Sequence, residues 1–433
     1  MNTSNIILFL WPLTCAALSV LGIIFKSPGP HYEGGGYYIL LSLFILGLSL
    51  YFQKKDWLKE FKLPLGSFIF GVFIILFSEP LYENDHYRYL WEGNAFLRGE
   101  NPYLHAPNSS LLDHLIFKGR ELIGFDHLTT VYPPLGIIFF GLGGIFGLEV
   151  GLRILMLLNA VLVYFCFLKL KDHTKPWMLV ALFPFFIKEF IQAIHIDLLA
   201  AFFFLLFLME KKGNFQKRVV FIFLSIWTKV LGVAALPFLL FLELKEKKDL
   251  LKRITPILVT AISLPLFLEW FVGLSSLMGV REFTIDWVWN PGFYSILTRV
   301  FELYDDEARG LTGQFYGGYL FILTGFCLYR LFKNDWELSK EFCLKLFYLI
   351  FAGLMFFTPV YNGWYAIWFV FPALLLRLNT GVFYGVISAF CYTHYGFEDY
   401  HYLGEFLTHI WFPLSIIELI RLKSSLPHQE RRT

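Results

Sequence analysis

The chain has 433 residues, of which 57% are hydrophobic and 20% aromatic, while only 16% carry a formal charge. Soluble proteins carry about 25% charged and 45–50% apolar residues, so this composition excludes a soluble globular enzyme, a secreted disulfide scaffold and a disordered chain, and indicates a polytopic membrane protein. The net charge of +2 is too small to indicate nucleic-acid binding, and five cysteines without a CxxC pair are interpreted as apolar packing residues.

Apolar runs follow one another along the whole chain. A membrane-spanning helix needs about 20 predominantly apolar residues. The runs are 6–25, 37–52, 63–78, 131–148, 151–168, 176–190, 197–209, 219–242, 254–274, 315–332, 341–358, 364–378, 380–395 and 407–420. Some are short or interrupted, so we expect an all-α transmembrane domain over 1–433 with 11 to 14 spans. The first run lacks a charged leader and a clear cleavage site, which favours a retained helix.

Charge in the connections predicts the orientation. Lysine and arginine concentrate in four segments, which we place in the cytoplasm: 53–62, 210–218, 243–253 and the tail 421–433. Acidic residues predominate in three others, which we place outside it: 79–130, 275–314 and 396–409. Segment 79–130 has eight acidic residues against four Lys or Arg. It is therefore predicted to be a large loop on the non-cytoplasmic side.

This orientation requires two apolar runs to be interrupted. Run 131–148 contains Gly141, Gly143, Gly144 and Gly147 and is predicted to be broken or re-entrant. Run 219–242 begins and ends at basic connections, so it is predicted to form two short helices that meet near Lys229 and Gly232. Irregular backbone at membrane depth is tolerated where it lines a wet cavity walled by protein.

The external loop is predicted to contain short helices, because a structureless loop of this length is unusual. Asn84 or Asp85 can cap a helix that runs to about Leu97 and ends at Gly99. Asp85 then shares a helix face with Arg88 and Glu92. On spacing alone, this is also the pattern of an interfacial amphipathic helix with an ordinary Arg–Glu pair.

The order of motifs in this loop resembles a known family. The block ENDHYRYLWEG at 83–93 is followed by GENPY at 99–103 and by VYPPL at 131–135. It is similar to the first external loop of GT-C-fold glycosyltransferases that use polyprenyl-phosphate sugars, such as the bacterial α-mannosyltransferases that build cell-envelope lipoglycans and the first GPI mannosyltransferase. The resemblance implies a GT-C-like fold, with catalytic roles for Asp85, Arg88 and Glu83 and substrate-binding roles for Glu92, Asn101 and Tyr103.

Later segments extend the resemblance over roughly residues 79–370. They resemble the family's P-x-x-x-K-E … H-x-D segment, its W-x-x-N stretch and its P … W-Y motif. The resemblance implies that substrate-binding residues also include Lys188, Glu189, His195, Asp197, Trp289, Asn290, Trp364 and Tyr365. The aromatic residues among them equally fit an interfacial belt.

Sugar transfer from a lipid phosphate needs a base for the acceptor hydroxyl and cations for the departing phosphate. Asp85 is the expected base, with Glu79 and Glu83 as weaker candidates, and Arg88 is the expected phosphate contact. Lys188, Gln192 and His195 are spaced i, i+4 and i+7, so they are predicted to share a helix face that contacts phosphate or sugar. Snorkelling of the lysine and a structural histidine are the alternative.

Lys229 lies inside an apolar run, where a lysine needs a partner or water. A substrate phosphate would satisfy it, and so would snorkelling from a short helix end. The loop histidines show no zinc-binding spacing, so no metal site is assigned and no cofactor is expected, with a divalent metal left open. The absence of a Walker A or dinucleotide motif fits a lipid-carried donor.

The sequence therefore predicts a multi-pass glycosyltransferase of a cell membrane, which is expected to be a bacterial inner membrane. It would transfer a hexose, expected to be mannose, from a polyprenyl-phosphate donor to a glycan or glycolipid acceptor on the non-cytoplasmic side, with inversion at the anomeric carbon. A lipid or sugar transporter or flippase is the alternative, although no repeated halves are visible. A partner-dependent subunit without catalysis of its own is a third interpretation.

Overall fold

The computed structural model describes residues 3–25, 33–210, 214–236, 250–273, 287–332, 340–395 and 401–422. Within these ranges the chain is helical, and its β pairing is a single isolated bridge between Trp289 and Val360. The structure confirms an all-α polytopic membrane protein. Most of the tail 421–433 and parts of the connections 243–253, 275–314 and 396–409 lie outside the described residues.

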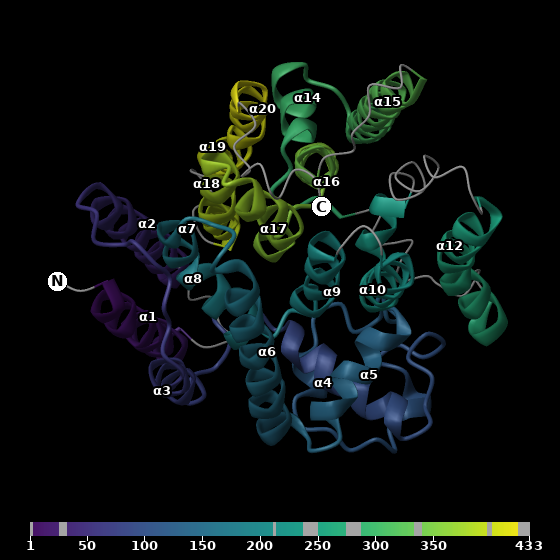
Figure 1. The fold of residues 1–433 in the computed structure, drawn as a ribbon. Helices are drawn as coiled ribbons and strands as arrows, with labels where there is room; N and C mark the ends of the chain where they lie inside the picture. Colours follow the sequence, from purple (N-terminus) through teal and green to yellow (C-terminus); the bar gives the residue numbers. More distant parts are fainter. Residues whose placement is uncertain are drawn as a thin grey trace.

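The helices follow the apolar runs in chain order (Figure 1). The first half contains α1 Thr3–Ile24, α2 Glu33–Lys54, α3 Leu65–Ile75, α4 Asp85–Leu97, α5 Pro134–Gly144, α6 Leu148–Leu170, α7 Pro176–Ala181, α8 Phe183–Phe185, α9 Asp197–Met209 and α10 Phe215–Thr228. The second half contains α12 Leu250–Val272, α14 Phe293–Val300, α15 Asp305–Phe332, α16 Lys340–Phe357, α17 Ile367–Leu376, α18 Asn379–Ile387, α19 His401–His409 and α20 Trp411–Arg421. In the described part of the chain, 3₁₀ segments occupy Ser110–Leu112, Arg120–Leu122, Val230–Ala235, Gly363–Ala366 and Ser388–Tyr395.

Among the described residues, four helical segments are long and apolar enough to cross a bilayer: Ile6–Ile24, Gly35–Lys54, Gly147–Leu170 and His401–Arg421. Five shorter apolar helices accompany them: Leu65–Ile75, Pro134–Gly144, Asp197–Met209, Thr255–Phe271 and Gly363–Leu376. Helices of 10–17 residues fall short of the full bilayer core. The expected number of 11 to 14 spans therefore stays a prediction.

Both expected interruptions are present in the structure. Helix α5 ends at Gly144 after 11 residues, and Gly147, whose φ of 77° suits only glycine without strain, starts the turn into α6. Helix α10 ends at Thr228, Lys229 is extended, and a 3₁₀ segment follows from Val230. The sequence prediction of a break at Lys229 is confirmed.

The glycines of α5 allow this helix to lie directly against α4. A Cβ atom on Gly93 of α4 would lie 2.4 Å from the backbone of Phe140, and one on Gly144 would lie 2.4 Å from the carbonyl oxygen of Leu90. The Asn94 side chain donates to the Gly144 carbonyl at 2.8 Å. Figure 1 shows the two helices side by side. Close backbone packing therefore fixes the helix that begins with Asp85.

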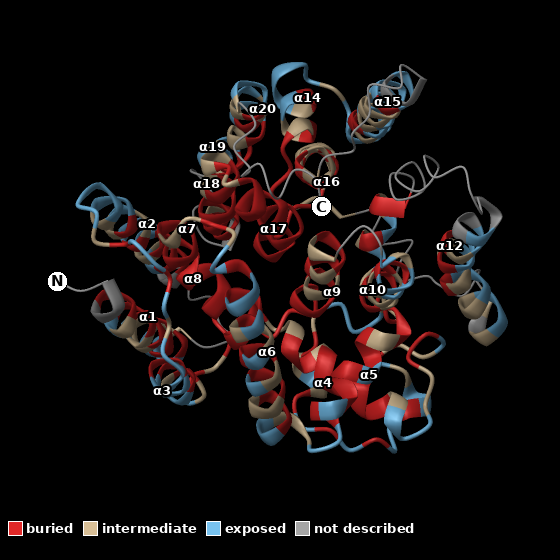
Figure 2. Ribbon diagram, in the orientation of Figure 1, coloured by how far each residue is buried: buried red, intermediate tan, exposed pale blue. Residues whose placement is uncertain are grey.

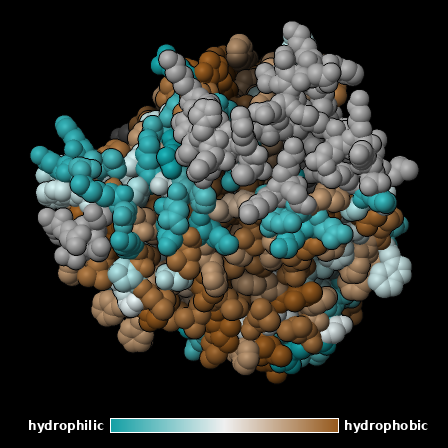
Figure 3. Space-filling model, in the orientation of Figure 1, coloured by the Kyte–Doolittle hydropathy of each residue, from teal (hydrophilic) through white to brown (hydrophobic). Residues whose placement is uncertain are grey.

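Helix α17 lies among the others, and every residue from Ile367 to Leu376 is buried (Figure 2). Helices α12 and α15 lie at the edge of the same view and expose more of their surface. Figure 3 shows apolar side chains over much of the visible face, with hydrophilic side chains beside them. Exposed apolar surface of this extent is what a membrane-embedded protein presents to lipid.

Candidate active site

Asp85 is the first residue of α4 and remains partly exposed. Asn84 is at the N-cap position but does not cap with its side chain, which donates instead to the Leu122 carbonyl at 3.1 Å. The Tyr89 hydroxyl donates to Asp85 Oδ2 at 3.2 Å. Burial raises the pKa of Asp85 above its usual range, and the nearby His195 opposes that rise only in part. A carboxylate of raised pKa is a better proton acceptor near neutral pH.

A fully buried ammonium group organises the polar core behind Asp85. Lys188 Nζ lies 2.6 Å from Glu83 Oε1 and 3.1 Å from Glu189 Oε2. It also donates to the Tyr392 hydroxyl, whose single proton can be donated to Glu83 or, at 2.9 Å, to Glu189. An ammonium carries three protons, so these three acceptors satisfy it completely.

His195 joins this core to Asp85. Its Nε2 lies 2.6 Å from Glu83 Oε2, and its Nδ1 lies 3.0 Å from the Tyr89 hydroxyl. The imidazole is stacked on the Trp364 ring with centroids 3.7 Å apart. Burial alone would raise the pKa of Glu83, but the charge of Lys188 and the hydrogen bonds from Lys188 and His195 reverse that effect and lower it to about 2. Glu83 is therefore a carboxylate at physiological pH.

Three residues of this core, Glu83, Glu189 and His195, have ligand atoms within 4.8 Å of one another, as a metal site would require. The Lys188 ammonium, however, already lies between the two carboxylates. The chain thus supplies its own cation at this position, and we assign no metal there.

Asp197 and Lys229 form a second ion pair. Asp197 is the first residue of α9, and Lys229 lies at the break after α10. Lys229 Nζ lies 3.1 Å from Asp197 Oδ2, and its side chain keeps 17% exposure, whereas that of Lys188 has none. The ammonium is over the rings of Tyr132 and Tyr365, 5.1 and 5.3 Å from their centroids. The Tyr132 ring also packs edge-on against the Tyr89 ring, with centroids 5.4 Å apart, and the Tyr89 hydroxyl donates to Asp85, so this pair and Asp85 belong to one site.

The expected common face of Lys188, Gln192 and His195 was wrong. Residues Phe186–Gln192 form a π-helix, and Ile194 has a positive φ of 53°, so α-helical spacing does not apply. Gln192 donates to Ser78 Oγ at 3.0 Å and to the Leu18 carbonyl, away from Glu83. Lys188 and His195 do meet, but at Glu83, where their contacts leave no proton of the lysine for a phosphate.

Arg88 holds the external loop in place through hydrogen bonds. Its guanidinium donates to Glu92 at 3.1 Å and to the carbonyls of Leu128, Gly124 and Phe125. These contacts are with the protein itself, so the geometry does not support Arg88 as the phosphate contact. Glu79, the other weak candidate for the base, is paired with Arg153 at 2.7 Å.

The other loop residues implied by the resemblance also contact the protein. Glu92 is fully buried and accepts from Thr130 Oγ1 at 2.7 Å, while burial raises its pKa. The Asn101 side chain accepts from the Tyr103 backbone at 3.0 Å, and the Tyr103 hydroxyl donates to the Tyr132 carbonyl at 2.8 Å. Together they hold the loop against the segment that carries Tyr132.

Trp289 and Asn290, of the predicted external segment 275–314, lie against the residues that follow α16. Trp289 pairs through its backbone with Pro359 and Tyr361, at 3.0 and 2.8 Å. Asn290 is fully buried, and its side-chain amide makes no hydrogen bond with the described residues. A buried amide of this kind is expected to bind water or a ligand. This keeps Asn290 as a candidate for substrate binding.

Besides Tyr132, sequence reasoning missed four aromatic residues of the site. The Tyr38 hydroxyl, on α2, donates to Glu189 Oε1 at 3.2 Å, and Trp368, on α17, donates to Asp197 Oδ1 at 3.2 Å. Tyr89 and Tyr392 are the other two. Tyr89 lies in the block at 83–93, which marked the segment but not this residue, and among the 23 tyrosines and 12 tryptophans of the chain no local pattern distinguishes the other three.

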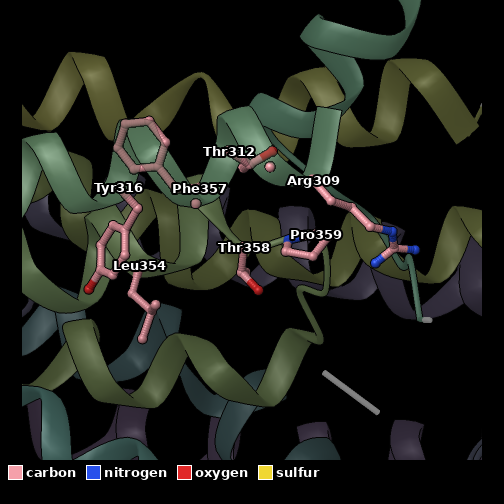
Figure 4. Close-up of a pocket in the computed structure, with 9 residues that line it drawn as sticks. Arg309, Thr312, Tyr316, Leu354, Phe357, Thr358 and Pro359 are labelled. Carbon is pink, nitrogen blue, oxygen red and sulfur yellow. The ribbon is translucent and has the colours of Figure 1, made fainter. Parts of the chain in front are cut away.

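A pocket of about 470 Å³ lies elsewhere, between α15 and the end of α16 (Figure 4). Its wall is mostly apolar and includes Leu354, Phe357, Pro359 and Tyr316, with Arg309 at one side. Arg309 also donates to the Trp287 carbonyl at 3.3 Å, and the Trp287 ring contacts Phe125 of the external loop. The pocket is therefore near the side of the protein that carries this loop.

Comparison with known proteins adds one decisive finding. Residues 68–245 match the model of the α-(1→6)-mannopyranosyltransferase family, N-terminal domain. This part of the chain is similar to the N-terminal domain of that mannosyltransferase family. The match includes α4, the π-helix and Lys229, so it covers most of the site, and it confirms the resemblance to bacterial α-mannosyltransferases. The chain is a glycosyltransferase. No curated protein and no solved structure matched it.

Proposed function

We propose that the protein transfers mannose from a polyprenyl-phosphate donor to a hydroxyl of a glycan or glycolipid acceptor. The observation that carries this proposal is a partly exposed carboxylate, Asp85, linked through Tyr89 and Tyr132 to a partly exposed ammonium, Lys229. The family match supports mannosyl transfer and favours an enzyme over a transporter. A lipid-carried donor fits an active site built on a membrane domain and an acidic external loop.

In the proposed reaction, the acceptor oxygen attacks the anomeric carbon as Asp85 takes the hydroxyl proton. The bond from the anomeric carbon to the phosphate oxygen breaks, and polyprenyl phosphate leaves with the electron pair. A single displacement of this kind inverts the anomeric carbon. Lys229 is placed to stabilise the phosphate, because its ammonium is partly exposed whereas that of Lys188 is saturated.

Reconstitution of the purified protein in sealed vesicles of known orientation tests the proposal directly. Radiolabelled polyprenyl-phosphate mannose, glucose and arabinose are supplied separately, with a membrane-impermeant acceptor on one side. We expect transfer of mannose only, and only when the acceptor faces the side that carries residues 79–130. Transfer from the cytoplasmic side alone would contradict the proposed sidedness, and transport without transfer would contradict the proposed reaction.

The pocket between α15 and α16 is where we place the isoprenoid chain of the donor. Gly313 lines this pocket, and a Cβ atom there would meet nothing within 4 Å. Gly313→Leu should therefore fold normally and displace part of the lipid. With about 0.8 kcal/mol for each CH₂ group that loses its burial, we expect KM for a long-chain donor to rise about tenfold.

Gly325→Leu is the matched control, because Gly325 is on the same helix, has equally open surroundings and does not line the pocket. Initial rates are measured against the concentration of long-chain and short-chain donors. Equal KM values for Gly313→Leu and Gly325→Leu with the long-chain donor would show that the pocket does not hold the lipid.

A further inference from the structure

A continuous row of hydrogen bonds leads from Asp85 into the protein core. The Tyr89 hydroxyl is 3.2 Å from Asp85 Oδ2 and 3.0 Å from His195 Nδ1. The other imidazole nitrogen, Nε2, is 2.6 Å from Glu83 Oε2. Asp85 is partly exposed, while Tyr89, His195 and Glu83 are buried. The hydrogen bonds thus connect the partly exposed carboxylate of Asp85 to the buried carboxylate of Glu83.

The protons in this row are fixed by what each group can donate. Glu83 accepts from Lys188 and Tyr392, so it is a carboxylate, and the facing Nε2 of His195 must carry a proton. In the neutral imidazole, Nδ1 is then an acceptor. The single proton of the Tyr89 hydroxyl can be donated to His195 or to Asp85, but not to both at once. This hydroxyl is therefore a two-position proton switch.

We propose that Tyr89 and His195 carry the acceptor proton away from Asp85 during sugar transfer. This inference rests on the proposed function, in which Asp85 is the base. When Asp85 has taken the proton, it donates that proton to the Tyr89 oxygen, and Tyr89 passes its own proton to His195 Nδ1. Asp85 is again a carboxylate, Tyr89 is again a neutral phenol, and His195 has become an imidazolium paired with Glu83.

The surroundings of His195 stabilise the imidazolium. Around it are two carboxylates, Glu83 and Glu189, whose nearest oxygens lie 2.6 and 3.9 Å from Nε2, and one cation, Lys188. Their charges sum to −1, so a protonated His195 makes the core neutral. Neutral tyrosines at 38, 89 and 392 and the Trp364 ring complete the near surroundings. The Tyr89 hydroxyl separates His195 from Asp85. The next charged groups are the Asp197–Lys229 pair, whose ammonium lies over the rings of Tyr132 and Tyr365.

The alternative is that the Tyr89 hydroxyl only orients Asp85. The Tyr89 ring is stacked on Phe140 with centroids 4.5 Å apart, and Tyr89→Phe keeps this packing. It removes only the hydroxyl, so Asp85 remains as a base without its exit for the proton. We expect the single-turnover transfer rate to fall about 10–100-fold, while KM for the donor stays unchanged.

A proton inventory distinguishes a relay from simple orientation. Transfer rates of the wild-type protein in mixtures of H₂O and D₂O should follow a curve, because more than one proton moves, and Tyr89→Phe should give a straight line. Tyr87→Phe is the matched control, since Tyr87 is on the same helix and packs against His86 and Gly119 rather than Asp85. It should behave as wild type in both respects.

The outcomes separate this inference from the function on which it rests. A straight inventory for the wild type, or a wild-type rate for Tyr89→Phe while Asp85→Asn is inactive, would overturn the relay and leave the base in place. A wild-type rate for Asp85→Asn would overturn the base itself.

Discussion

Asp85→Asn should lower the rate of mannosyl transfer by about 10²–10⁴-fold, the usual effect of losing a positioned general base. The substitution keeps the size of the side chain and an oxygen that can accept from Tyr89, whose hydroxyl is 3.2 Å away. It removes only the ability to take a proton. Donor binding should survive, because the proposed phosphate contact, Lys229, is on another element and paired with Asp197. The measurements are transfer rate and donor affinity in nanodiscs.

Asp126→Asn is the matched control for this experiment. Asp126 is a carboxylate of the same external loop, but its side chain is about half exposed and faces His127 rather than the site. It should transfer mannose at the wild-type rate. Near-normal transfer by Asp85→Asn would refute its assignment as the base and direct attention to Glu83, Glu189 and Asp197.

The pH dependence of transfer follows from the same residue. A general base must be deprotonated, so the rate should fall as the pH drops through the pKa of Asp85. Because burial raises that pKa, the acid side of the profile should lie above the range of an ordinary aspartate.

The helices could be predicted from the sequence because apolar runs and helix signals are local properties. The helix Asp85–Leu97 begins and ends where Asp85 and Gly99 indicated, and the glycines of run 131–148 and the lone Lys229 marked real interruptions. In each case the residues that cause the feature lie within it. Orientation, the number of spans and the roles of the site residues remain predictions.

The interior of the site could not be predicted, because it depends on contacts between distant segments. Tyr38 and Tyr392 are 151 and 203 residues from Glu189, yet both donate to its carboxylate. The residues next to either tyrosine in the sequence do not indicate that its partner is Glu189. The π-helix at Phe186–Gln192 was missed for a related reason, since a period of 3.6 was assumed where the backbone departs from it.

The second large effect is expected on stability, from Lys188→Met. Methionine fills a similar volume but removes the ammonium between Glu83 and Glu189, whose side chains are at most 4% exposed. Two buried carboxylates would then face each other without a cation. Loss of one member of a buried ion pair typically costs about 3–5 kcal/mol. We expect a markedly lower Tm and a smaller yield of monodisperse protein in detergent.

Charge removal on the partner should reverse much of this loss. Glu189→Gln carries no charge, and its single amide oxygen can still accept from either Tyr38 or Tyr392, so Lys188→Met combined with Glu189→Gln should be more stable than Lys188→Met alone. Lys118→Met is the control, because Lys118 and Glu149 form an exposed pair, and such pairs contribute little to stability. Its Tm should match the wild type.

The comparison of the single and double variants decides what Lys188 does. If its methylene chain mattered most, Lys188→Met would be nearly neutral and the second substitution would add its own loss. If its charge matters most, the second substitution restores stability, because one uncompensated carboxylate has been removed. Tm values that fall additively in the double variant would therefore exclude the ammonium as the stabilising group. Recovery would show that Lys188 holds Glu83 in the ionised form that His195 contacts.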